Sequence, residues 1–363
     1  MYYFFDEIQY SDSWDLWLKT LYDSNPQCRA VATGSASPVL ADKASESGVG
    51  RWSVISIPTL SFYEYCTLLN LEAPELAPDI KPSLLRELSR QEQTMTFEKL
   101  SPLNRFFNHY LAAGGFPELA LSRDEYYAQR VLRDDVVDKV LKRDIPALYN
   151  IRSITDLEKI FLYLCYNSSN IISMEAISRE LSGVSRPTVE KYIQYLESAN
   201  LIYVSNPIDI RGKKILKSQP KIYIADAAIR NAVIMQDDLF TNPTEMGIMV
   251  ETAIYKHVRA FYYRLTTNVG YFRNSSKDNE IDVVVDYPGS RILIEVKYRE
   301  QYSLGEKASI VSEADKAASA MLVTKRENDF GPLQINPAVY RIPAYAFMYL
   351  LGHAEKNGYV NYM

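Results

Sequence analysis

Short apolar runs that end abruptly in charged or small polar residues constrain this chain more than any other feature. The run at residues 2–5 is followed at once by Asp6 and Glu7, and the run at residues 28–33 by a small polar turn. Between such runs, apolar residues recur at helical spacing, for example over residues 13–22. Strand-length runs that alternate with helical segments predict an α/β protein. A chain of 363 residues provides for two or three domains.

The acidic pair after the first run is a candidate site. In open α/β sheets, ligands bind beyond the carboxyl ends of the strands. There, Asp6 could hold a Mg²⁺ ion and Glu7 could polarise a water molecule. A strand that simply ends in a solvated acidic turn is the alternative.

The next part of the chain predicts a helical connector. Residues 71–100 contain three prolines and many charges, which is typical of a linker that passes into a helix at residues 83–90. Further helices are predicted over residues 106–111 and 123–143. The sequence Gly-Gly-Phe-Pro-Glu at residues 114–118 predicts a sharp turn between them.

Three helices followed by two strands are predicted over residues 156–224, with Ser173 as an N-cap. This is the winged-helix plan, in which the third helix enters the major groove of DNA through its N-terminal residues. Here those residues are Arg186, Thr188 and Lys191. The loop between the two strands carries basic residues suited to phosphate contacts, namely Arg211, Lys213 and Lys214. Winged helices also dock proteins, so a protein partner is the alternative to DNA.

The last segment predicts a cluster of carboxylates. Alternation along a strand places Glu295 and Lys297 on one face. Asp282 lies on the preceding strand of the hairpin, and Glu251 on the helix predicted over residues 248–263. Such clusters bind Mg²⁺ and hold a phosphodiester, while the lysine orients or activates water. The alternative is a fold retained without cleavage, in which the lysine and glutamate form an ordinary ion pair.

The order of elements around this cluster resembles the restriction-endonuclease-like fold. Over most of its length the chain resembles a family of bacterial and archaeal AAA-type P-loop ATPases that carry such a C-terminal half. The segments that carry the resemblance are FFDEIQ, TGSAS, GGFPE, KIYIADAAIRNA and IEVKY. The resemblance implies that Asp6 and Glu7 belong to the Walker B strand and that Thr33 or Ser35 senses the γ-phosphate. It implies that Arg51 acts on a neighbouring subunit's nucleotide; an ordinary surface arginine is the alternative.

A P-loop needs a glycine-rich turn and a lysine before the Walker B strand, and no GxxxxGK[ST] occurs in the sequence. We therefore expect the chain to begin in mid-domain, before the Walker B strand but after the Walker A segment. ATP is then expected as a ligand only of a full-length form. A truncated sheet would expose strand edges and favour a homo-oligomer.

Composition indicates the cellular compartment of the protein and the kinds of partner it can have. The three cysteines are far apart and form no CxxC pair, which is typical of reduced thiols in the cytoplasm. No apolar stretch is long enough to cross a membrane. The net charge of −5 argues against a protein that is basic all over, but it leaves room for a local basic patch.

These inferences predict an α/β multi-domain protein with four parts. They are a partial P-loop ATPase core at residues 1–70, a helical lid or connector at 71–155, a winged helix at 156–226 and a restriction-endonuclease-like domain at 227–363. The leading hypothesis is an ATPase-like protein that acts on DNA through the winged helix and a Mg²⁺-dependent nuclease-like domain. The alternative is a nucleotide-switched protein-interaction module whose nuclease-like fold cuts nothing.

Overall fold

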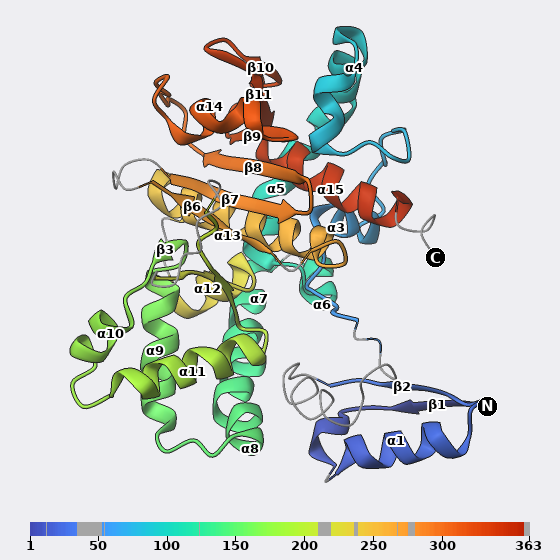
Figure 1. The fold of residues 1–363 in the computed structure, drawn as a ribbon, viewed down its shortest axis with the longest axis vertical. Helices are drawn as coiled ribbons and strands as arrows, with labels where there is room; N and C mark the ends of the chain where they lie inside the picture. Colours follow the sequence, from blue (N-terminus) through green and yellow to red (C-terminus); the bar gives the residue numbers. More distant parts are fainter. Residues whose placement is uncertain are drawn as a thin grey trace. The chain divides into compact units, whose positions relative to one another are not determined.

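A computed structural model describes residues 1–11, 13–34, 53, 55–122, 124–209, 219–235, 239–266, 268–274 and 280–358 (Figure 1). The described residues form helices and several β-sheets, so the protein is mixed α/β as the sequence predicts. The chain divides into two compact units. The first comprises Met1–Ile57, Arg133–Leu164 and Ser173–Tyr203, and the second comprises Pro58–Leu132, Cys165–Ile172 and Val204–Met363.

The first unit begins with two parallel strands, β1 (Tyr2–Phe5) and β2 (Arg29–Ala32), joined through helix α1 (Trp14–Ser24). Both strands lie where the sequence predicts them, but they are not buried on both faces. Because side chains alternate along a strand, one face of β1 packs with α1 and the other is open. Tyr2 and Phe4 on the open face are 73% and 76% exposed.

The helix predicted over residues 123–143 is longer than expected. It begins as α7 (Glu125–Val131), passes through wider π-type turns and ends as α8 (Ile145–Leu148). Pro146 therefore does not end the helical segment, because it lies in the first turn of α8, where a missing N–H is tolerated.

Three helices and three short strands follow. They are α9 (Ile154–Tyr166), β3 (Asn170–Ile171), α10 (Met174–Glu180), α11 (Arg186–Ser198), β4 (Ile202–Ser205) and β5 (Lys221–Ile224). The hydroxyl of Ser173 accepts a hydrogen bond from the backbone N–H of Ala176, so the predicted N-cap is confirmed. Ser185 caps α11 in the same way. The strands form a sheet of order β3-β5-β4.

A six-stranded sheet of order β10-β11-β9-β8-β7-β6 forms the second unit's centre (Figure 1). Its strands are β6 (Val269–Arg273), β7 (Glu280–Tyr287), β8 (Ser290–Lys297), β9 (Ser319–Thr324), β10 (Gly331–Leu333) and β11 (Asn336–Pro343). β9 pairs in parallel with β8 and β11, and the other neighbours are antiparallel. β7 and β8 form the hairpin that the sequence predicts around Asp282 and Glu295.

The second unit also contains helices. They are α3 (Phe62–Leu68), α4 (Arg90–Leu100), α5 (Phe107–Ala113), α6 (Pro117–Leu121), α12 (Ala227–Ile234), α13 (Pro243–Tyr262), α14 (Ser309–Glu313) and α15 (Ala344–Gly358). α13 and α15 contact each other and the sheet (Figure 1). α14 begins after a backbone turn in which the N–H of Ala308 donates to the carbonyl of Gly305, and it passes into a short 3-10 turn at Ala314–Lys316. Within the described residues, no helix has the length and apolar character of a membrane span.

Candidate functional site

The carboxylates predicted to converge come from three elements of the second unit. Asp282 lies on β7, Glu295 and Lys297 on β8, and Glu251 on α13. The antiparallel register pairs Val283 with Ile294, so Asp282 and Glu295 are cross-strand neighbours one residue further along. The five central residues of β8 and residues 281–285 of β7 are buried, which keeps Asp282 and Glu295 away from water.

Hydrogen bonds fix the carboxylates in place. Oδ2 of Asp282 accepts from the backbone N–H of Val296 at 2.8 Å. The ammonium of Lys297 pairs with Glu295. The hydroxyl of Tyr223, on β5, donates to Oε1 of Glu251 at 2.9 Å. The sequence therefore predicts correctly which of these side chains meet on one face.

A second lysine lies among the carboxylates and was not predicted. Nζ of Lys221, the first residue of β5, lies 2.7 Å from Glu251, 2.6 Å from Glu280 and 3.1 Å from Asp282. Its side chain is only 3% exposed. In the sequence, Lys221 reads as the end of a basic loop. Its partners lie 30 or more positions away, so no local pattern indicates their contact.

Burial and mutual repulsion make this patch electrostatically unusual. Burial, reinforced by the charge of Asp282, raises the pKa of Glu295 to about 8 and that of Glu251 to about 7. Burial alone would raise the pKa of Asp282 as well, but the two lysines outweigh it and lower that pKa. The pKa values of Lys221 and Lys297 are raised, since their carboxylate partners outweigh the effect of burial.

The chemistry of the donor set fits Mg²⁺. The ion prefers carboxylate oxygens, and Oε2 of Glu295 is buried with no hydrogen-bond partner among the described residues. In the present conformation, however, the ammonium of Lys221 lies among three of the carboxylates. In the part of the chain that the structure describes, no group of three or more acidic, histidine or cysteine side chains has metal-binding geometry.

The predicted nucleotide-site residues that are described also meet. Because β1 and β2 are parallel, their carboxyl ends lie side by side, and the Thr33 hydroxyl donates to Asp6. The backbone N–H of Glu7 donates to the same hydroxyl at 3.3 Å, and Glu7 has a left-handed backbone (φ 48°). The side chains of Asp6, Glu7 and Thr33 are exposed. Ser35 and Arg51 lie outside the described residues.

The predicted DNA-contacting residues at the start of α11 already have protein partners. The guanidinium of Arg186 pairs with Glu190 at 2.8 Å and also with Glu175. Thr188 shares a 2.8 Å hydrogen bond with the Ser185 hydroxyl. Lys191 is exposed and lies over a tyrosine ring. The loop residues Arg211, Lys213 and Lys214 lie outside the described residues.

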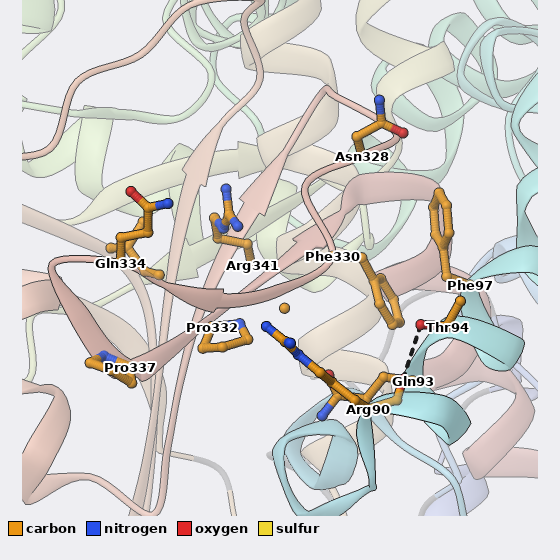
Figure 2. A pocket seen from close by; sticks show the side chains of 12 residues that line it. Arg90, Gln93, Thr94, Phe97, Asn328, Phe330, Pro332, Gln334, Pro337 and Arg341 are labelled. Atoms are coloured by element: carbon orange, nitrogen blue, oxygen red, sulfur yellow. Dashed lines mark hydrogen bonds between the residues drawn. The ribbon is translucent and has the colours of Figure 1, made fainter.

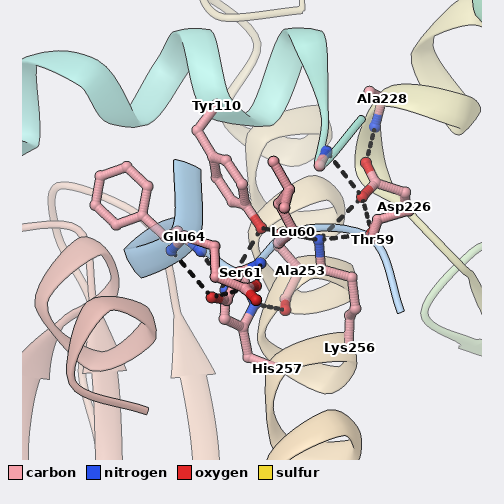
Figure 3. A network of polar contacts seen from close by, with 12 residues as sticks. Thr59, Leu60, Ser61, Glu64, Tyr110, Asp226, Ala228, Ala253, Lys256 and His257 are labelled. Carbon is pink, nitrogen blue, oxygen red and sulfur yellow. Dashed lines mark hydrogen bonds and ion pairs between the residues drawn. The ribbon is translucent and has the colours of Figure 1, made fainter. Parts of the chain in front are cut away.

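A buried polar network connects the GGFPE turn with the ADAAIRNA segment, two segments in which the sequence predicts no site residue (Figure 3). Nζ of Lys256, on α13, lies 2.9 Å from Asp226, 3.0 Å from the Thr59 hydroxyl and 2.8 Å from the Tyr110 hydroxyl. Asp226, from the ADAAIRNA segment, also accepts from the backbone N–H of Gly115 in the GGFPE turn at 3.3 Å. The GGFPE turn and the ADAAIRNA segment therefore have a structural role, because both pack around the buried ion pair of Lys256 and Asp226.

A surface pocket of about 650 Å³ lies between α4 and the β10–β11 hairpin (Figure 2). Arg90, Phe97, Phe330 and Arg341 are among the residues that line it. Arg341 is paired with Asp329 at 3.1 Å. None of the residues predicted to have a function lines this pocket, and we assign it no role in the proposed chemistry.

Three family models match the chain. An AAA domain matches residues 1–66, a domain of unknown function (DUF8612) matches residues 104–239, and a domain of unknown function (DUF4143) matches residues 246–345. The resemblance found in the sequence is thus confirmed at its two ends, and it supports an ATPase-like family. The AAA match contains Asp6 and Thr33, and the C-terminal match contains the carboxylate patch.

The curated relatives carry no functional name. An uncharacterized protein of Methanocaldococcus jannaschii is 26% identical over 299 residues, which are 81% of this chain and 60% of that protein. A second, from Haemophilus influenzae, is 27% identical over 69% of this chain and 57% of its own length. The chain therefore spans about three fifths of the length of these relatives. No solved structure gives a significant match.

Proposed function

We propose that this ATPase-like protein acts on DNA and that its C-terminal carboxylate patch hydrolyses phosphodiesters with a divalent metal. The observation that carries the proposal is the meeting of Glu251, Asp282, Glu295 and Lys297 in one largely buried patch on α13, β7 and β8. Buried carboxylates of this number cost stability, and a catalytic role accounts for that cost better than a role in packing.

Each side chain has a distinct task in this proposal. Glu251, Asp282 and Glu295 would hold Mg²⁺, which when bound would neutralise charge on the phosphate and supply a more acidic water. Asp282 is ionised at neutral pH because the adjacent lysines lower its pKa. Lys297 remains protonated because its pKa is raised, so it can hold a phosphate oxygen or orient the attacking water.

DNA would be held by residues outside the patch. On this proposal α11 contributes Arg186, Thr188 and Lys191, and the basic loop contributes Arg211, Lys213 and Lys214. Asp6, Glu7, Thr33, Ser35 and Arg51 would respond to ATP in a longer form of the protein. The exposed apolar face of β1 would favour a homo-oligomer of the present chain.

The test is DNA cleavage by the full chain. Supercoiled, linear and branched DNA are incubated with Mn²⁺ or with EDTA, using the wild type, Glu295→Gln and the matched control Glu300→Gln. Glu300 is a 71% exposed surface glutamate. We expect metal-dependent cutting that falls at least about 100-fold in Glu295→Gln and is unchanged in Glu300→Gln. Circular dichroism checks that both variants fold. Equal cutting by all three proteins would refute the catalytic assignment.

A second candidate is a protein-interaction module that cuts nothing. It is favoured by the pairing of Lys221 with the carboxylates and by the pairing of Arg186 with two glutamates. Salt-sensitive DNA binding without metal-dependent cutting would leave α11 as the functional part. Neither cutting nor DNA binding would favour a protein partner.

A further inference from the structure

The ammonium of Lys221 lies where the carboxylate patch would otherwise need a metal ion. We propose that Lys221 is an internal cation that competes with divalent metal for Glu251 and Asp282, so that metal enters only when this side chain leaves. The inference rests on the metal site of the proposed function and adds a residue that controls access to it.

The ammonium group of Lys221 has a carboxylate partner for each of its N–H donors. An ammonium group has three N–H donors, and Nζ has one carboxylate oxygen from each of Glu251, Glu280 and Asp282 within 3.1 Å. These oxygens come from α13 and β7, two elements far apart in the sequence. A metal ion at this position would need the same oxygen lone pairs, so the two cations exclude each other.

Charge balance favours the same conclusion. The patch has four carboxylates, Glu251, Glu280, Asp282 and Glu295, and two lysines, Lys221 and Lys297. Without Lys221, three of those carboxylates lose their closest cation while remaining largely buried. Uncompensated buried carboxylates attract a divalent cation strongly.

The backbone at Lys221 does not have to move for this exchange. Lys221 pairs with Ile171 of β3, and the next residue, Ile222, pairs with Asn170. The strand therefore holds the main chain in place, and rotation of the lysine side chain is enough to release the oxygens.

Manganese binding tests the inference without using catalysis. Binding of Mn²⁺ to the full chain is measured by electron paramagnetic resonance of the free ion. The proteins are the wild type, Lys221→Met and Lys316→Met. Methionine approximates the aliphatic part of the lysine side chain without the ammonium group, and Lys316 is a 72% exposed lysine that controls for the change in net charge. We expect Lys221→Met to bind Mn²⁺ at least about tenfold more tightly than the other two proteins. Equal affinity of all three would overturn the proposal.

A second variant covers the case in which Lys221→Met fails to fold. The double variant Lys221→Met/Glu280→Gln removes one charge of each sign and keeps Glu251, Asp282 and Glu295. We expect Mn²⁺ to raise its melting temperature more than it raises that of the wild type. If Mn²⁺ shifts both melting temperatures equally, Lys221 does not compete with metal.

The two proposals can fail separately. If Lys221→Met gains a Mn²⁺ site but no protein cuts DNA, the nuclease proposal fails and the role of Lys221 stands. If the wild type cuts DNA with Mn²⁺ and binds the ion as tightly as Lys221→Met, the role of Lys221 fails and the nuclease proposal stands.

Discussion

A buried carboxyl group whose pKa is raised makes stability depend on pH, and Glu295 is such a group. Its pKa rises from 4.5 to about 8, first because of burial and then because of Asp282. Between these values the folded protein keeps a proton that the unfolded chain has released. The free energy of unfolding therefore falls as pH rises through this window. Glu251 acts in the same direction up to about pH 7.

We expect Glu295→Gln to gain stability relative to the wild type as pH rises from about 5 to about 9. The reason is that glutamine never has to ionise in the buried patch. Urea unfolding at a series of pH values, in EDTA, measures the difference. Glu300→Gln is the control, because the pKa of Glu300 is lowered by Lys325 and its effect lies at more acidic pH. Parallel stability curves for wild type and Glu295→Gln would contradict the assignment of a raised pKa.

The turn at Gly114 and Gly115 has no room for a side chain at either position. A Cβ on Gly115 would lie 2.4 Å from the backbone nitrogen of Leu60, and one on Gly114 would lie 2.8 Å from Asp226. Gly114 also has a φ of +72°, which side chains rarely adopt. The GGFPE segment is therefore explained by close packing of the backbone against the buried Lys256–Asp226 pair.

We expect Gly115→Ala to lower the free energy of unfolding by about 2–4 kcal/mol, since backbone rather than a flexible side chain must move. Gly247→Ala is the matched control. Gly247 lies inside α13 with no neighbour near its Cβ position, and alanine there should stabilise the helix by about 0.5–1 kcal/mol. Urea unfolding compares the two. A Gly115→Ala protein as stable as the wild type would show that the turn relaxes freely.

Elements with strong local signals were predictable, and contacts between distant residues were not. β7 and β8 read as strands because each contains a β-branched apolar run, and alternation along β8 placed Glu295 and Lys297 on one face. β10 is a short strand, and its Gly-Pro-Leu sequence carries no clear period. β1 was placed correctly but expected to be buried, because an apolar run does not reveal how many layers cover it.

In the candidate site, too, local sequence patterns were predictive and contacts between distant residues were not. The patch of Glu251, Asp282, Glu295 and Lys297 followed from strand alternation and element order. Lys221 was missed because its role depends on three carboxylates brought together only by the fold. Likewise, the exposed basic position of Arg186 was predicted, but its pairing with Glu175 and Glu190 was not.

At the scale of the whole molecule, nucleotide binding needs more than the strands that this chain contains. β1 and β2 bring Asp6 and Thr33 together, but the sequence has no glycine-rich turn followed by lysine and a hydroxyl residue to hold the phosphates. We expect no tight binding of a fluorescent ATP analogue to the 363-residue chain by itself, measured by anisotropy with Mg²⁺. Asp6→Asn should leave any weak signal unchanged. Sub-micromolar binding that Asp6→Asn abolishes would contradict this expectation.

The packing of α1 against β1 also has an optical consequence. The three tryptophans, Trp14, Trp17 and Trp52, all lie within the first 57 residues, whereas tyrosines are spread over the whole chain. Trp14 is buried and Trp17 makes an edge contact with Phe5. Excitation that selects indole over phenol therefore reports on the AAA-matched segment alone. Its emission can reveal whether that segment melts independently of the unit that holds the carboxylate patch.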